Sequence, residues 1–348
     1  MAPEYLFREF KASQHRTLDR AVAAYQAYLQ AVQAGRPLKG GMHWKKIKGR
    51  EYLYKYRDRA GHGSSLGPRS PETEGLFAEF GRRRREIAAQ LDTRRQQLAE
   101  AARFCRAALI HRLPDPVVRI LRHLSLGDLA GTPLMVIDTH ALHAFAFAAG
   151  VFIDAPPDSP LFSGAAQGLT LVASAALPPE EFLRLLRRAD RSYAYETLPG
   201  PGLAAVNQHG FRVRCLRPPT ARAPHRMLGR DAPSVTVPAA AGDLAALVNS
   251  PKFSQVVIGR RGDPVTMVAP DPRALALHKL WLSQQEERPP QKRLRDRTQA
   301  AALAELILRY LPQYYFFSAE LQFFPAQVAR LAETQVEGYE STADLEAD

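Results

Sequence analysis

The sequence predicts an α+β fold in which a mixed-sheet core carries an N-terminal basic helical module and a C-terminal helical bundle. Short apolar runs of strand type alternate with helical periods through the middle of the chain. Long stretches with helical spacing stand on both sides of it, and the excess positive charge is confined to the first third. We therefore expect a basic module at 1–112, a core at 113–270, a bundle at 271–335 and an acidic tail at 336–348.

The composition is that of a soluble globular chain, with 348 residues, 46% of them hydrophobic and 24% charged. No apolar run approaches the roughly 20 residues that a membrane span needs. No basic segment followed by an apolar block opens the chain. Cys105 and Cys215 lie far apart and outside any metal-type spacing. Together these observations predict a cytoplasmic protein.

The formal net charge of +12 is unevenly distributed. Residues 1–112 hold 23 lysines and arginines against 11 aspartates and glutamates, whereas residues 113–348 hold 24 of each kind. A basic module on a neutral core predicts a polyanionic partner such as RNA, DNA or an acidic protein. A solvated basic face that only aids solubility explains the same charge, and both interpretations stay open.

Two helices are predicted in the basic module. Apolar residues recur at three- and four-residue spacing from Leu18 to Val32, which indicates a helix that ends near Gly35. A second, of about 40 residues, begins with Ser70 as its cap and runs to Pro114. It contains the run Arg82, Arg83, Arg84 and Arg85, which we regard as candidates for binding nucleic acid or another anion.

Between these helices, aromatic residues alternate with cations. Tyr52, Tyr54 and Tyr56 fall on one face of a predicted strand, and residues 61–70 read as a loop rich in turn residues. Aromatic rings interleaved with cations can stack bases and follow phosphates. They can also cover a neighbouring helix, and the sequence does not decide between these roles.

The core begins with a short strand at 134–137, followed by Asp138, Thr139 and an alanine-rich helix that ends near Gly150. Further strands are predicted at 169–172 and at 211–216, the last closing a hairpin. The remaining predictions are helices at 116–124, 178–186, 242–250, 274–283 and 291–311, a short strand at 234–237, and a hairpin at 256–268 placed at the edge of the core sheet. Aromatic residues at 314–317 and 323–324 are expected to pack the bundle onto the core.

Several of these segments carry a specific resemblance to a known family. They are KKIKGREYLY at 45–54, SLGPRSPETE at 65–74, PDPRA at 270–274, HKLWLS at 278–283 and KRLRD at 292–296. With the strand–turn–helix layout after residue 134, they resemble a bacterial nucleotidyltransferase-like family of the polymerase-β-type superfamily. The resemblance covers most of residues 41–312.

The resemblance implies a nucleotide site whose catalytic acids are replaced. Asp138 stands at the family's turn glycine and Thr139 matches, while Gly168 and Thr170 stand at its Asp-x-Asp pair and Arg214 at its third aspartate. A two-metal site needs carboxylates to hold its Mg²⁺ ions. We therefore expect a degenerate site without metal, with Asp138 and Thr139 as nucleotide-binding candidates.

Three more residues are carried over from the family as candidates for binding the nucleotide: Lys279, Arg295 and Asp296. A structural salt bridge between Lys279 and Asp296 is the alternative role for this pair. A guanidinium at position 214 would bind a phosphate without metal, or it would simply be a surface arginine.

Three functional hypotheses follow. In the first, the chain is a nucleotidyltransferase-family member that binds a nucleotide or nucleic acid without catalysis. Alternatively, it is an active enzyme that uses Mg²⁺ and relocated acids such as Asp154 or Asp158, and transfers a nucleotidyl group from a nucleoside triphosphate to RNA, protein or a small molecule. The third is a non-catalytic partner-binding protein.

His140 and His143 lack the further ligands of a zinc site, and Cys215 is predicted to be a small buried apolar residue.

Overall fold

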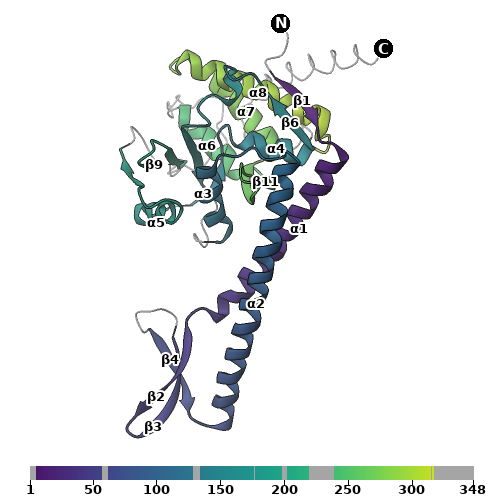
Figure 1. Cartoon of the computed structure of the whole chain (residues 1–348). Coiled ribbons are helices and arrows are strands. Elements are labelled where there is room, and N and C mark those ends of the chain that lie inside the picture. The colour runs from purple at the N-terminus through teal and green to yellow at the C-terminus, as the bar shows by residue number, and fades with distance from the viewer. Residues whose placement is uncertain are drawn as a thin grey trace. The chain divides into compact units, whose positions relative to one another are not determined.

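The computed structural model describes residues 5–56, 62–127, 134–175, 177–197, 202–218, 239–314 and 316, with only the backbone described at 239–243 (Figure 1). The predicted strand at 234–237, the aromatic residues at 315, 317 and 323–324, and the acidic tail lie outside this part. None of the helices within it is both long and apolar enough to cross a membrane.

The chain forms two compact units, one of Met1–His15 with Ile110–Asp348 and the other of Arg16–Leu109. Helix α1 (Ala12–Gly35) begins in the first unit and continues in the second. The boundaries predicted at residues 112, 270 and 335 stay predictions.

A mixed five-stranded sheet forms the centre of the first unit, which confirms the predicted α+β class. Its order is β5-β7-β10-β9-β8. Strands β7 and β10 run parallel, and the other neighbours are antiparallel. The strands are β5 (Leu134–Val136), β7 (Gly168–Ala173), β8 (Ala194–Glu196), β9 (Gly202–Val206) and β10 (Arg212–Leu216).

The register of the parallel pair positions the site described below. Arg212 lies beside Gly168, and Arg214 beside Thr170. Because side chains alternate between the two faces of a strand, these four positions share one face. The residues between them, Val213 and the leucines of β7, are buried on the other.

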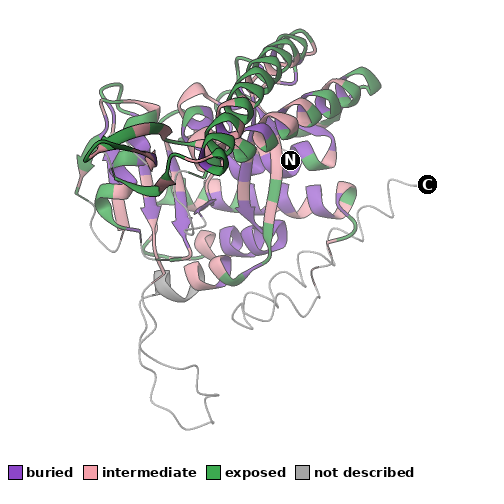
Figure 2. Ribbon diagram, turned by 90° about the horizontal axis from the view of Figure 1, so that it is seen from below, coloured by how far each residue is buried: buried purple, intermediate pink, exposed green. Residues whose placement is uncertain are grey.

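Six helices follow residue 110 in the part of this unit that the structure describes, and all six were predicted from the sequence. Asp271 caps α7 by accepting a hydrogen bond from the amide of Arg273 at 2.9 Å. The helices are α3 (Asp115–Ser125), α4 (Ala141–Ala149), α5 (Pro179–Ala189), α6 (Ala239–Asn249), α7 (Pro272–Ser283) and α8 (Pro290–Tyr310), with a 3-10 turn at Pro160–Phe162. Buried residues concentrate in the strands and helices of this unit (Figure 2).

The predicted hairpin is present as β11 (Lys252–Ile258) and β12 (Pro264–Pro270), but its expected place at the edge of the core sheet is wrong. The two strands form a separate sheet. The end of β11 is paired by the segment that leads into α3, since the amides of Arg112 and Leu113 donate to the carbonyl of Ile258 at 2.9 and 3.2 Å. A further two-stranded sheet, β1 (Leu6–Glu9) with β6 (Val151–Asp154), was not predicted.

The second unit combines α1 and α2 (Pro71–Ala107) with an antiparallel sheet of β2 (Gly41–Ile47), β3 (Arg50–Tyr56) and β4 (Gly63–Pro68). The predicted start of α2 is confirmed by a capping box in which Ser70 and Thr73 exchange hydrogen bonds. The prediction of a loop at 61–70 is wrong for residues 63–68, which form strand β4. Gly63 pairs so closely with β3 that a Cβ atom would collide with the carbonyl of Lys55, which only glycine allows.

Both cysteines are buried and unpaired, and burial raises the pKa of each thiol to about 12. They therefore behave as small apolar residues, as expected for Cys215.

A buried ion pair anchors α7 and gives the first prediction. Asp271 and Arg273 are 1% and 4% exposed, and Nη2 of the arginine lies 2.7 Å from the carboxylate. Replacing Arg273 with Met leaves the carboxylate buried without its partner, so we expect the free energy of unfolding to fall by about 3–5 kcal/mol. The double variant with Asp271→Ala should recover part of this loss. Guanidinium denaturation followed by Trp281 fluorescence, in a Trp44→Phe background, measures the effect.

The matched control is Arg261→Met, which removes an exposed partner of Asp115 in the same unit. Its cost should stay below about 1 kcal/mol. Equal losses for Arg273→Met and Arg261→Met would show that burial of the Asp271 pair does not matter.

Candidate functional site

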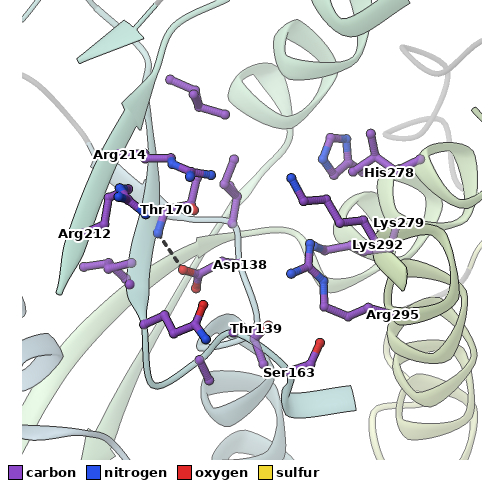
Figure 3. Close-up of a pocket in the computed structure, with 18 of the residues that line it drawn as sticks. Asp138, Thr139, Ser163, Thr170, Arg212, Arg214, His278, Lys279, Lys292 and Arg295 are labelled. Carbon is purple, nitrogen blue, oxygen red and sulfur yellow. Dashed lines mark hydrogen bonds between the residues drawn. The ribbon is translucent and has the colours of Figure 1, made fainter. Parts of the chain in front are cut away.

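A cavity of about 420 Å³ lies between one face of the core sheet and helices α6, α7 and α8 (Figure 3). The turn after β5 contributes Asp138 and Thr139, and the loop before β7 contributes Ser163 and Gly164. The helical side supplies Lys279 from α7. Segments that are distant in the sequence therefore meet at a single pocket, whose size is in the range of small-molecule sites.

Positive charge dominates the wall of this pocket. Six cationic side chains reach it from β10, α7, α8 and the turn before α8. Among the described lining residues, Asp138 is the single carboxylate. The six cations are Arg288 and five that Figure 3 labels, namely Arg212, Arg214, Lys279, Lys292 and Arg295.

The carboxylate of Asp138 is engaged by backbone amides on both oxygens. The amide of His140 donates to Oδ1 at 3.0 Å, and the amide of Thr170 donates to Oδ2 at 2.5 Å. Asp138 therefore joins the turn after β5 to the neighbouring strand β7. Nε2 of His140 adds a second link, since it donates to the carbonyl of Gly168 at 3.1 Å.

Behind the wall, Asp296 organises three of the six cations. Its carboxylate is fully buried and lies 3.3 Å from Lys279 Nζ, 2.5 Å from Arg288 Nε and 3.7 Å from Arg295 Nη2. One negative charge thus faces three positive charges. The salt bridge considered between Lys279 and Asp296 is present, and the same lysine also lines the pocket.

The lysines of the pocket are held in an environment that disfavours their charge. Burial lowers the pKa of Lys279 from its ordinary 10.5, although Asp296 opposes this effect. The pKa of Lys292 is lowered by burial and by the neighbouring arginines. An anion placed among these groups would relieve both the repulsion and the loss of solvation.

On the sheet side, Arg212 and Arg214 differ in their partners. Arg212 forms two hydrogen bonds with Glu196 of β8. Nε of Arg214 is buried and has no hydrogen-bond partner among the described atoms, and the same holds for Nε of Arg295 on α8. Buried guanidinium nitrogens are normally satisfied. Both side chains line the pocket.

An apolar surface completes the cavity. Leu216, Leu244 and Leu282 line it from β10, α6 and α7. A ligand that matches this wall combines an anionic part with an apolar or aromatic body.

Comparison with protein families shows what kind of domain holds this pocket. Residues 115–322, more than half of the chain, match the model of a family described as nucleotidyltransferase. The chain belongs to this nucleotidyltransferase family. Searches of curated proteins and of solved structures gave no match.

Within this nucleotidyltransferase domain, the three positions that the resemblance predicted to match the family's acids meet at the pocket. Gly168 and Thr170 line it from β7, and Arg214 lies beside Thr170 on β10. Position 168 has no room for a side chain, because a Cβ atom there would collide with the carbonyl of Arg212. The convergence of these positions followed from the strand pattern, while their chemical roles remain predictions.

The predicted nucleotide-binding residues divide into two groups. Asp138, Thr139, Lys279 and Arg295 line the pocket, whereas Asp296 is fully buried behind it. The hydroxyl of Thr139 accepts a hydrogen bond from Gln299 of α8 at 2.9 Å, which ties the turn to that helix.

Three pocket cations were missed in the sequence. Arg212 could have been found, since it stands two residues before Arg214 on the same strand face. Lys292 stands three residues before Arg295, a spacing that places both on one helix face. Arg288 lies in a turn and had no such signal.

Other candidates from the sequence lie away from this wall. Asp154 pairs with Arg8 at 2.7 Å, and neither it nor the exposed Asp158 lines the pocket. The arginines at 82–85 are exposed on α2, where Arg82 and Arg83 pair with glutamates of the same helix. Burial lowers the pKa of His143 to about 3, so its ring is neutral and stacks on Phe162 at 5.4 Å.

The described residues of the pocket do not suit Mg²⁺. Magnesium prefers several hard oxygen ligands, carboxylates above all. The one carboxylate of the wall has both oxygens bound by amides, and six cations face the space that a metal would occupy. No cluster of three acidic, histidine or cysteine residues suited to a metal occurs in the part of the chain that the structure describes.

The close approach of β7 and β10 gives the second prediction. Replacing Gly168 with Ala forces a methyl group against the backbone of Arg212, so the strands must separate at this end of the pocket. We expect the free energy of unfolding to fall by about 1–3 kcal/mol, the usual cost of overpacking. Thermal unfolding monitored by circular dichroism measures the change.

Gly41→Ala is the control, because a Cβ atom at this strand glycine meets nothing within 4 Å. It should leave stability nearly unchanged. If both variants unfold at the same temperature as the parent, the contact between residues 168 and 212 does not constrain the site.

Proposed function

We propose that this nucleotidyltransferase-family protein binds the phosphates of a nucleotide directly through arginine and lysine, and that the two-metal site of the family is degenerate. The observation that carries the proposal is the charge of the pocket wall. Six cations face one carboxylate whose oxygens each already accept a hydrogen bond from a backbone amide. Charge-assisted hydrogen bonds from guanidinium groups replace metal ions as phosphate ligands in this mode.

The apolar wall favours a nucleotide over a simple inorganic anion. Leu216, Leu244 and Leu282 offer a surface on which a base or ribose can pack, while the cations lie across the cavity. We further infer the polymerase-β-type arrangement for this domain, because the parallel pair β7 and β10 presents positions 168, 170 and 214 on one face beside the turn at 138–139.

In this mode Arg214 and Arg295 contact the phosphates, and Lys279 and Lys292 supply further charge. Asp296 positions the cations from behind and does not touch the ligand. Asp138 shapes the turn. No Mg²⁺ is required for binding, and no nucleotidyl transfer takes place.

Measuring transfer directly separates this proposal from an active enzyme with relocated acids. The protein is incubated with α-³²P nucleoside triphosphates, Mg²⁺ or Mn²⁺, and total RNA. We expect no label on protein or RNA, together with nucleotide-dependent thermal stabilisation that persists in EDTA. Transfer that disappears with chelator would overturn the proposal.

Replacing Arg214 with Ala tests the phosphate contact. Its loss should weaken nucleotide binding about ten- to hundred-fold, since a charged hydrogen bond contributes about 1.5–3 kcal/mol. Arg214→Lys should retain part of the affinity. Isothermal titration calorimetry measures the affinity of each variant in EDTA for ATP, GTP, CTP, UTP and inorganic triphosphate.

The control is Arg217→Ala, which removes a cation from the same segment outside the pocket lining. Unchanged binding in Arg214→Ala, or equal loss in both variants, would contradict the proposed contact. If inorganic triphosphate binds as tightly as the four nucleotides, the apolar wall does not contribute to affinity and that part of the proposal is wrong.

The lysines predict a pH dependence. Lys279 and Lys292 have pKa values below the ordinary 10.5, and a bound anion favours their protonated forms. Affinity should therefore be highest at low and neutral pH and decline as the pH rises toward 10, earlier than ordinary lysines would cause. Titrations in buffers of different ionisation enthalpy should show proton uptake in alkaline solution.

The conservative variant Lys292→Arg keeps its charge throughout this range and should shift the decline to higher pH. Affinity that stays constant from pH 7 to 10 would show that neither lysine contacts the ligand.

A further inference from the structure

The sheet of the second unit has two chemically different faces. Antiparallel partners lie on the same face, and His43 stands opposite Tyr54 while Lys45 stands opposite Tyr52. Tyr56 belongs to the same face by alternation along β3. We call this set, His43, Lys45, Tyr52, Tyr54 and Tyr56, the tyrosine face.

Helix α2 packs against the opposite face. Leu53, which alternates with the tyrosines, is fully buried, and its cross-strand partner Trp44 lies 5.9 Å from the ring of Phe77 in α2. Arg69 adds a cation over the Trp44 ring at 5.1 Å. Trp44 and Leu53 therefore lie on the face that packs against the helix. The tyrosines, for which the sequence left this role open, lie on the other face.

The rings of the tyrosine face contact each other. His43 stacks on Tyr56 with centroids 4.1 Å apart and planes inclined by 6°, and Tyr54 lies 6.1 Å from Tyr56. Nζ of Lys45 lies 5.4 Å from the centre of the Tyr54 ring. The three tyrosines are half-buried, so part of each remains accessible. The result is a row of aromatic surfaces with a cation beside it.

The turn between β2 and β3 adds more positive charge. Lys48 and Gly49 both have positive φ, 47° and 80°, the pattern of a two-residue hairpin turn. Such a turn favours Asn or Gly at its first position, and lysine there is conformationally costly. Four cations, Lys45, Lys46, Lys48 and Arg50, surround this tip.

These cations differ from others in the same unit. Arg69 is held by Glu51 and Glu74 at 2.6 and 2.7 Å. In the part of this unit that the structure describes, no carboxylate forms an ion pair with any of the four cations at the tip. Their charge is therefore available to an anionic partner.

We propose that the tyrosine face and the adjoining hairpin tip bind single-stranded nucleic acid. Unpaired bases stack on the tyrosine rings, and the phosphates contact Lys45, Lys48 and Arg50. An acidic peptide would match the charge but leave the aromatic row unused. A duplex would hide the base faces that the rings need. The surface belongs to a different unit from the nucleotide pocket, so it does not depend on the function proposed there.

Binding of fluorescein-labelled 20-mers to the full chain tests the proposal, with fluorescence anisotropy measured at 50 and 200 mM salt. The probes are oligo(dT), oligo(U) and a mixed-sequence duplex. We expect both single strands to bind more tightly than the duplex, and the comparison of oligo(dT) with oligo(U) distinguishes DNA from RNA.

Two variants separate stacking from charge. Tyr54→Ala should weaken single-strand binding at least about five-fold, while Tyr54→Phe, which keeps the ring, should not. Lys45→Gln with Lys48→Gly should lower affinity and reduce the slope of log affinity against log salt by about 1.4. Glycine at 48 suits the positive φ, so this variant should fold normally, which circular dichroism verifies.

The matched control is Arg95→Gln with Arg103→Gln, which removes two exposed cations from α2 in the same unit. Its affinity should stay within two-fold of the parent. The proposal fails if this control loses as much affinity as the hairpin variant, if Tyr54→Ala binds as the parent does, or if the duplex binds as tightly as the single strands.

Discussion

The buried carboxylate of Asp296 determines the chemistry of the pocket. An ionised carboxylate with no exposure to water needs positive charge around it, and Lys279, Arg288 and Arg295 provide three such charges. Because one negative charge cannot offset three positive ones, the excess is directed into the cavity. The helices α7 and α8 are joined by the same contacts, so the stability of this pair and the charge of the pocket share one origin.

Asp138 lies on the opposite wall, where its carboxylate connects two backbone segments. Its oxygens are bound by the amides of His140 and Thr170, which connects the turn after β5 to β7. A glycine at this place would leave the turn open for phosphate. Asp138 instead closes it with hydrogen bonds to two backbone amides, and the cations of the pocket lie toward Arg214 and the helices.

Much of this fold could be predicted from the sequence because its elements carry strong local signals. The cap at Ser70, the alternation at Tyr52–Tyr56 and the apolar strands around residues 134 and 169 each specify an element directly. Strand β4 was missed because its pairing depends on the absence of side chains at Gly63, which resembles a loop signal. The sheet of β1 and β6 joins residues about 145 positions apart, and no local pattern encodes that contact.

The site was predictable to a smaller extent, for a related reason. Positions 168, 170 and 214 could be placed together, since strand periodicity and the hairpin brought them to one face. Arg288 reaches the wall from a turn, and its place depends on the buried Asp296. The resemblance named Asp296 as a ligand, but only the three-dimensional packing shows that it stands behind the residues that line the cavity.

Gly168 has a consequence for how this site can evolve. A single base change turns some glycine codons into aspartate codons, so mutation can readily introduce an acidic residue at this position. The carbonyl of Arg212 occupies the space that any side chain at 168 would need. An acidic residue there would require a compensating shift of β10, and the intermediate would be less stable than either end point. The close contact between β7 and β10 therefore constrains position 168 to glycine, and the pocket keeps its present lining of cations.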